Sequence, residues 1–141
     1  MFKGKRLDNS EWVEGSLWLN GARALIRTDL GFPVGASWCE VDPASVGQFI
    51  GFLDKHGERI FEGDVVTDER LHIFGNVVYS DKNPSFIINC FVNGPMYNDD
   101  YWEDLEIYGN IHDDPKRFSR TNFLVKMVKQ AIFGEDESDE T

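Results

Sequence analysis

The sequence is short of cysteine, of basic residues and of long apolar runs, and each shortage excludes a class of protein. Its two cysteines, Cys39 and Cys90, form no C-x-x-C pair, so we expect no zinc knuckle. Two reduced thiols in a core are the expected state, with one disulfide as the alternative. No segment approaches the roughly 20 apolar residues of a membrane span, and no apolar leader follows Met1. We therefore expect a soluble, cytoplasmic protein with no membrane partner.

Basic residues are outnumbered, with 14 Lys and Arg against 25 Asp and Glu, for a formal net charge of −11. Five of the acids lie in the last seven residues, so the rest of the chain still carries −6. A protein that binds nucleic acid through its phosphates needs a basic face, and this composition does not favour one. Direct nucleic-acid binding is therefore not expected.

Large apolar residues are plentiful: 41% of the 141 residues are hydrophobic, including eleven Phe and four Trp. Each buried aromatic side chain removes roughly 150–250 Å² from water, so the chain can form a real core. Its length fits one domain of ordinary size. We expect one folded domain over residues 1–134 and a disordered acidic tail at residues 135–141.

Short apolar segments separated by Gly and Pro turns predict a mainly β fold. Residues 11–19 alternate like a hairpin around Gly15, and Asn20-Gly21 is a strong turn signal. Residues 71–79 read either as one bulged strand or as a hairpin broken at Gly75. Further strands are predicted at residues 22–28, 37–41, 48–52, 60–61, 85–92 and 105–111 and from residue 65 onward.

The sequence of residues 46–66 predicts a definite local structure. Gly51, Gly57 and Gly63 fall where a strand bends or a turn tightens, as a small, strongly bent barrel requires. Curling into a barrel also protects the edges of a small sheet. The pattern therefore predicts a small, partly open barrel with an N-terminal hairpin.

The last apolar segment changes its period. Apolar residues recur at i, i+3 and i+4, which predicts an amphipathic helix over about residues 122–133 that Gly134 ends. Its apolar stripe packs on its own barrel or pairs subunits, since both use the same residues.

Residues 98–106 hold five acids in nine positions. Carboxylates suit Mg²⁺ or Ca²⁺, but the spacing lacks the EF-hand pattern, and we interpret the segment as a solvated acidic loop without metal or cofactor. Tyr97, Tyr101 and Trp102 lie in the same segment. They suit a surface for a protein partner, and the alternative is a loop folded back over the barrel. No nucleophile elbow, phosphate loop or dinucleotide fingerprint is present, so no catalytic residue is assigned.

Several short segments follow one another in a distinctive order. They are residues 2–6 (FKGKR), 11–17 (EWVEGSL), 41–43 (VDP), 46–49 (VGQF), Gly51 followed by 54–57 (DKHG), 60–66 (IFEGDVV) and 105–111 (LEIYGNI). This ordered set resembles the YopX family of phage and prophage proteins. The family's molecular function is uncharacterised, so no catalytic or binding residue carries over. The resemblance implies a small SH3-type barrel with additional elements, oligomeric assembly and residence in the cytoplasm of a bacterial host.

These observations support one main hypothesis and two alternatives. The main one is a non-enzymatic binding or adaptor module that forms a homo-oligomer and contacts a phage or host protein. The first alternative is an acidic inhibitor that mimics nucleic acid and occupies a DNA- or RNA-binding protein. The second is a metal-dependent hydrolase that uses the acids between Asp99 and Glu106.

Overall fold

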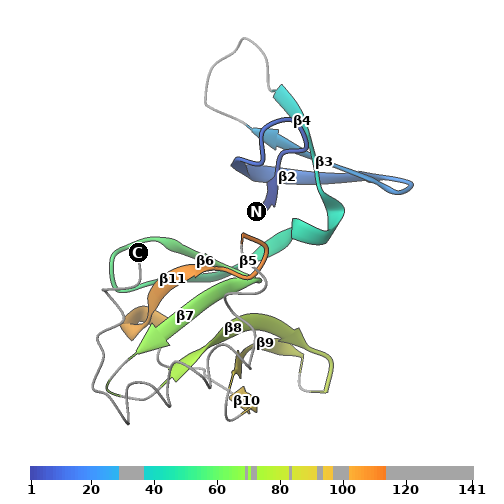
Figure 1. The fold of residues 1–141 in the computed structure, drawn as a ribbon. Helices are drawn as coiled ribbons and strands as arrows, with labels where there is room; N and C mark the ends of the chain where they lie inside the picture. The colour runs from blue at the N-terminus through green and yellow to red at the C-terminus, as the bar shows by residue number, and fades with distance from the viewer. Residues whose placement is uncertain are drawn as a thin grey trace, which may run out of the picture.

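The fold is described from a computed structural model, which covers residues 1–28, 37–68, 70, 73–82, 84–91, 94–96 and 102–113 (Figure 1). The described strands form two antiparallel sheets, of six and of five strands, which confirms the mainly β class. The first sheet has the order β4-β3-β2-β1-β5-β6 and the second the order β10-β9-β8-β7-β11. Within the described residues, no helix is long and apolar enough to cross a membrane.

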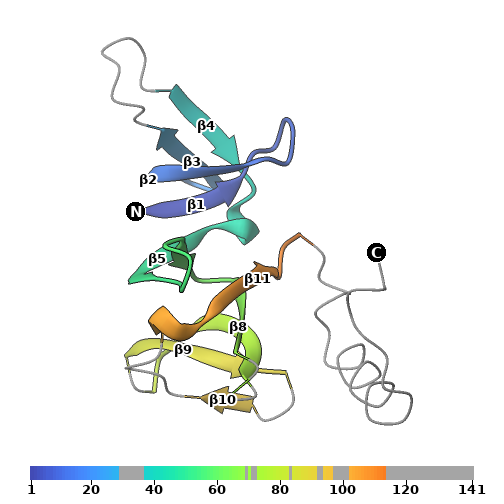
Figure 2. The same ribbon diagram turned by 90° about the vertical axis from the view of Figure 1, so that its left-hand side faces the viewer.

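Strands of the first sheet are β1 (Phe2–Lys5), β2 (Trp12–Asn20), β3 (Arg23–Thr28), β4 (Ser37–Val41), β5 (Gly47–Leu53) and β6 (Arg59–Phe61). Strands of the second are β7 (Asp64–Asp68), β8 (Ile73–Ser80), β9 (Ser85–Cys90), β10 (Gly94–Met96) and β11 (Glu106–Asn110). The described residues also contain two short 3-10 turns, η1 (Pro43–Ser45) between β4 and β5 and η2 (Trp102–Asp104) before β11. Figure 2 shows β3 and β4 at the end of the molecule remote from β8–β10.

The N-terminal hairpin closes later than the alternation around Gly15 suggests. β2 runs through Gly15 as one strand, and Asn20 pairs with Arg23 across a two-residue loop. Gly21, the first loop residue, has φ +62°, the conformation that such tight hairpin loops require. Gly15 has a different role: a Cβ there would lie 1.9 Å from the Arg27 carbonyl oxygen, so glycine lets β2 and β3 approach closely.

The three glycines predicted to lie at bends or turns of residues 46–66 do so. Gly51, Gly57 and Gly63 all have positive φ, of +97°, +80° and +96°. β5 shifts its register against β6 around Gly51, and Gly63 lies at the corner where the chain leaves the first sheet for the second. Gly51 and Gly57 therefore shape β5 and its turn into β6, and Gly63 shapes the step from the first sheet to the second.

Two sheets take the place of the single small barrel that the sequence suggests. β8 continues through Gly75 as one strand, because glycine accommodates the Asn89 carbonyl oxygen 2.4 Å from where a Cβ would stand. β8 then pairs with β7 and β9 and builds a second sheet. The end of β4 returns to the end of β1 through one bridge, Arg6 with Val41, and no closed barrel forms among the described strands. The predicted helix at residues 122–133 and the tail at 135–141 lie outside the described residues.

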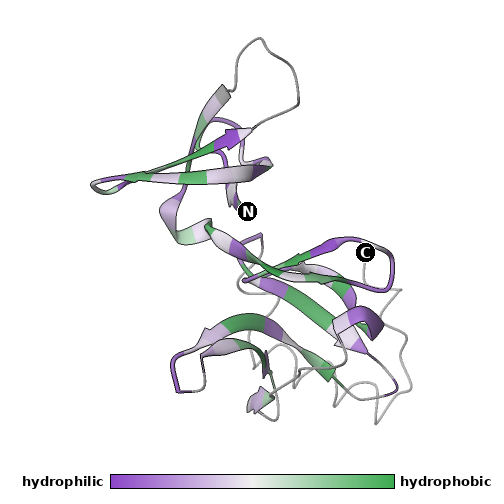
Figure 3. Cartoon of the chain, turned by 180° about the vertical axis from the view of Figure 1, so that it is seen from behind, coloured by the Kyte–Doolittle hydropathy of each residue, from purple (hydrophilic) through white to green (hydrophobic). Residues whose placement is uncertain are grey.

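The main core lies between the β5–β6 end of the first sheet and the inner face of the second. It contains Ile60, Val66, Ile73, Val77, Ile88, Trp102 and Leu105. A smaller core of Ala24, Ile26 and Val41 lies within the first sheet. Figure 3 shows apolar residues along the strands of both sheets and polar residues at the turns.

Candidate functional site

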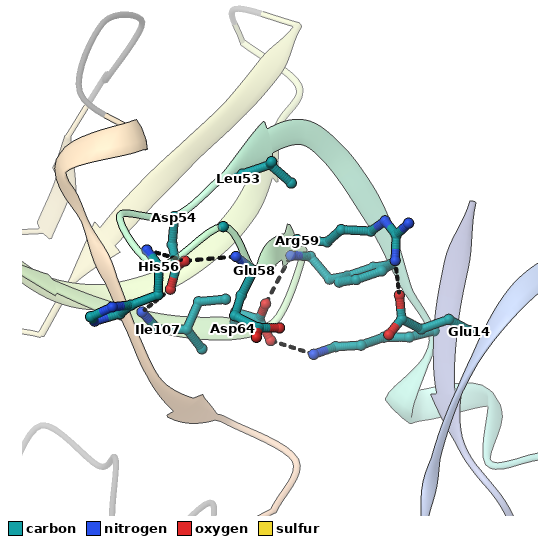
Figure 4. A pocket seen from close by; sticks show the side chains of 11 residues that line it. Glu14, Leu53, Asp54, His56, Glu58, Arg59, Asp64 and Ile107 are labelled. Atoms are coloured by element: carbon teal, nitrogen blue, oxygen red, sulfur yellow. Dashed lines mark hydrogen bonds and ion pairs between the residues drawn. The ribbon is translucent and has the colours of Figure 1, made fainter.

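A polar hollow of about 700 Å³ lies where the two sheets meet (Figure 4). Its lining comes from β1, β2, the β5–β6 turn, β6, β7 and β11, so it draws on segments far apart in the sequence. Charged side chains of both signs line it, among them Lys3, Glu14, Asp54, Arg59 and Asp64. Whether this hollow can perform chemistry depends on which of these groups are already paired.

Asp64 is the most buried of these charged side chains, with 1% of its surface exposed. Its Oδ1 accepts hydrogen bonds from the Lys3 ammonium at 2.6 Å and from Asn110 Nδ2 at 3.0 Å. Its Oδ2 accepts from the backbone N–H of Phe61 at 2.8 Å, which is the local bond that closes the β6–β7 corner. One carboxylate therefore ties together β1, the β6–β7 corner and β11, and its bonds make it a structural anchor.

Lys3, the ion-pair partner of Asp64, also contacts aromatic rings. Its ammonium lies 4.7 Å from the centroid of the Trp12 ring and 5.0 Å from that of Phe61, within range of cation–π attraction. The Trp12 Nε1–H in turn donates to Asp113 at 3.0 Å, and Lys5 lies 3.1 Å from the same carboxylate. This arrangement orients the Lys3 ammonium toward Asp64.

Asp54 organises the turn between β5 and β6. Its Oδ1 accepts from the backbone N–H groups of His56 and Glu58, both at 2.9 Å, the pattern by which Asp shapes a tight turn. Its Oδ2 accepts from the N–H of Ile107 on β11 at 3.2 Å. His56 Nε2 lies 3.2 Å from Glu106, so the turn is fastened to β11 by its side chains as well. These contacts make the hollow a polar junction between the sheets.

The acidic segment proposed from the sequence divides into described and undescribed parts. Tyr97 and Tyr101 lie outside the described residues. Trp102 is 3% exposed, belongs to the main core and stacks on Phe52 with ring centroids 6.3 Å apart. Of the two alternatives for this segment, Trp102 therefore follows the folded-back one and does not present a surface to a partner.

The acids of the same segment are also divided. Asp99 and Asp100 lie outside the described residues, and Glu103 and Asp104 are exposed on η2. Glu106 lies 3.4 Å from the Lys55 ammonium and 3.2 Å from His56. Within the part of the chain that the structure describes, no three His, Cys, Asp or Glu side chains are grouped so that they could hold a metal ion.

Two tryptophans that the sequence did not single out meet on the outer face of the first sheet. Trp18 of β2 is 52% exposed and Trp38 of β4 is 47% exposed. Their ring centroids lie 5.7 Å apart with an interplanar angle of 57°. A signal was present: Trp18 falls in register with Glu14, Ser16 and Asn20, the polar side of the strand. An aromatic residue on the polar side of an alternating strand marks a surface rather than a core.

One pair of opposite charges lies beside this Trp18–Trp38 face. The Arg23 guanidinium donates two bonds of 3.0 Å to the Glu40 carboxylate on the neighbouring strand. These hydrogen bonds hold the pKa of Glu40 below its ordinary value and raise the pKa of Arg23. An apolar centre with paired charges near it resembles the core and rim of a protein–protein contact.

Both cysteines are free thiols, as the sequence suggested, and they lie in different sheets. Cys39 is on β4 and Cys90 on β9, and each is half-buried. Burial raises the pKa of the Cys90 thiol.

Comparison with known protein families gives a match. The family model described as YopX protein matches residues 2–119, which include the eleven strands of the described residues. No curated protein matches the chain.

Proposed function

The chain belongs to the YopX family, and from this premise we propose that it is a non-enzymatic binding module that assembles with copies of itself. The observation that carries this proposal is the Trp18–Trp38 face. Two indoles, each about half exposed, lie side by side on one face of a sheet. Tryptophan is enriched at the centres of protein contacts, where it contributes a large apolar area at a low cost in conformational entropy.

The polar hollow supports a binding role over an enzymatic one. Lys3 and Asp64 form an ion pair, and Asp54 accepts hydrogen bonds from three backbone donors. A catalytic base or nucleophile needs a free group within reach of a substrate, and these groups are committed to holding the sheets together.

A protein partner fits the exposed face better than nucleic acid does. The chain carries −11, and of the arginines beside the face Arg23 is paired with Glu40, which leaves the exposed Arg27 opposite Trp38. Phosphate binding needs several unpaired cations, whereas a protein contact needs an apolar centre with a polar rim. A second copy of this chain is the partner that we propose, with a phage or host protein bound by the resulting assembly in the cytoplasm of a bacterial host.

The two alternative functions have less support. A nucleic-acid mimic needs rows of unpaired carboxylates, but several exposed acids lie in ion pairs, among them Asp8, Glu14, Glu40, Glu106 and Asp113. A metal-dependent hydrolase would use the acids at 99–106, of which Glu106 is already paired with Lys55. Calorimetric titration with Mg²⁺, Mn²⁺ and Ca²⁺ tests the second alternative, and we expect no binding heat.

Sedimentation velocity over a range of concentrations tests self-assembly. We expect a species heavier than the 16.2 kDa chain in the wild type and its loss in Trp18→Ser. Tyr79→Ser is the matched control, since Tyr79 is an aromatic residue of similar exposure, 48%, on the second sheet. A wild-type protein that stays monomeric at every concentration would contradict the proposed self-assembly.

A further inference from the structure

We propose that two copies of the chain join by antiparallel pairing of β4 with β4 of the second copy, centred on Trp38. This deepens and rests on the proposed function, since it names the edge and the register through which self-assembly occurs. The observations that carry it are the hydrogen-bonding direction of each residue of β4 and the position of the Trp18–Trp38 face beside that edge.

The backbone of β4 shows which of its groups face outward. The Leu7 N–H donates to the Glu40 carbonyl at 3.1 Å from the side opposite β3, so the backbone groups of Glu40 point away from β3. Directions alternate along an antiparallel strand, so the N–H and C=O of Trp38 point the same way. β4 is the last strand of its sheet, and none of the described residues pairs with it beside Trp38. Trp38 therefore presents one outward donor and one outward acceptor.

Symmetry then selects the register. Two identical antiparallel strands are related by a two-fold axis, and a residue on the axis pairs with its own copy. A pair centred on Trp38 uses only the outward N–H and C=O of the two Trp38 residues. A pair centred on Cys39 would need the Glu40 carbonyl, which already accepts from Leu7. Leu7 also blocks the edge beyond Cys39, so the new ladder spans about residues 37–39.

The side chains support the same register. Directly opposed residues of an antiparallel pair lie on the same face of the sheet. The two Trp38 rings would therefore adjoin, each with Trp18 at 5.7 Å on its own chain, and form a row of four indoles. This row would cover apolar surface that one chain leaves in water, and that burial drives association beyond what two backbone hydrogen bonds contribute.

A disulfide cross-link tests the register. In this pairing Cys39 of one copy lies opposite residue 37 of the other, as a non-hydrogen-bonded pair with Cα atoms about 4.5 Å apart, close enough for a disulfide. We expect Ser37→Cys to form a covalent dimer under mild oxidation. Mass spectrometry of the non-reduced digest should find the introduced thiol joined to Cys39 of the second copy.

The double variant Ser37→Cys/Cys39→Ser is the matched control, because it keeps the introduced thiol and removes its partner. We expect no covalent dimer from it or from the wild type. A covalent dimer from the double variant would place the axis elsewhere and overturn the Trp38 register. No cross-link in Ser37→Cys, while the wild type still sediments as an oligomer, would overturn β4 pairing and leave self-assembly standing.

Amide hydrogen exchange of the unmodified protein gives a second measurement. The outward N–H of Trp38 should exchange quickly in dilute protein and become protected as concentration rises, because only association covers it. The N–H of Cys39 points toward β3 and Ile26, so it serves as an internal control that is protected at both concentrations. Exchange at Trp38 that does not change while the protein assembles would contradict pairing through this edge.

Discussion

The two sheets differ in how completely this chain covers their apolar surface. The second sheet packs against a core of seven buried residues that also draws Ile60 from β6. The first sheet has a core of three buried residues, Ala24, Ile26 and Val41, and leaves Trp18 and Trp38 about half exposed. Among the described residues, the second sheet therefore takes part in the larger buried core, whereas the first leaves two neighbouring indoles about half in solvent.

The junction between the sheets differs from both cores because it is polar. Asp64 connects Lys3 of β1, Asn110 of β11 and the β6–β7 corner through one buried carboxylate. A carboxylate with three specific donors requires a definite arrangement of the strands that supply them. We infer that this network fixes how the first sheet meets the second.

The largest effect is expected from Asp64→Ala. The substitution leaves the Lys3 ammonium and the Asn110 amide without their acceptor in a buried place, and breaking such a pair typically costs about 3–5 kcal/mol. Denaturant unfolding measures this loss. Asp113→Ala is the control, since it removes an exposed carboxylate that also pairs with a lysine of β1. We expect about 1 kcal/mol or less there, and equal losses in the two variants would show that the junction is not the anchor.

The next largest effect is expected from two substitutions that compare the two cores. Ile88 and Ile26 are both 0% exposed, but Ile88 belongs to the larger core and Ile26 to the smaller. Replacing a buried Ile by Ala costs about 2–5 kcal/mol, depending on how far the surroundings collapse into the cavity. We expect Ile88→Ala in the upper half of that range and Ile26→Ala in the lower half, measured by denaturant unfolding. The reverse order would mean that the first sheet is the better packed.

The turns of the fold could be predicted from the sequence because their causes are local. Gly51, Gly57 and Gly63 adopt positive φ, and glycine is the residue that reaches it without strain. The division into two sheets could not be predicted in the same way. It depends on pairings such as Ile107 with Val66, between segments about 40 residues apart, and alternation shows which side of a strand is buried but not which strand lies beside it.

The residues of the candidate site also differ in how far the sequence alone predicts their placement. Trp102 stands among acids, and its sequence neighbours suggest exposure, but the chain turns at η2 and places it in the core. Trp18 stands among apolar residues that suggest burial, yet the period of two places it on the outer face. The sequence leaves two alternatives open for Trp102, whereas the strand period carries the information for Trp18.

A smaller effect separates folding from assembly. If the exposed face joins subunits, the melting temperature of the wild type should rise with protein concentration, since association stabilises the folded chain. Trp18→Ser should remove this dependence, while in dilute protein its unfolding free energy changes by only about 1 kcal/mol or less. Tyr79→Ser on the second sheet should keep the dependence. Calorimetry at several concentrations measures all three, and a wild-type melting temperature that never varies would count against assembly through this face.

The smallest effect concerns the exposed pair of the first sheet. Hydrogen bonds from Arg23 lower the pKa of Glu40, so Arg23→Gln should raise that pKa toward its ordinary value, as NMR titration of the carboxyl carbon would measure. Since the lowered pKa belongs to the folded state, the pair stabilises the protein above the ordinary range of Glu and loses that contribution as pH falls through the lowered pKa. Arg6→Gln is the control, because Arg6 lowers the pKa of Asp8 and should leave Glu40 unchanged. We expect a clear shift in the Glu40 pKa with little change in the free energy of unfolding at neutral pH. The Lys3–Asp64 pair carries the same charges but is buried, so its loss should cost more stability than loss of this exposed pair.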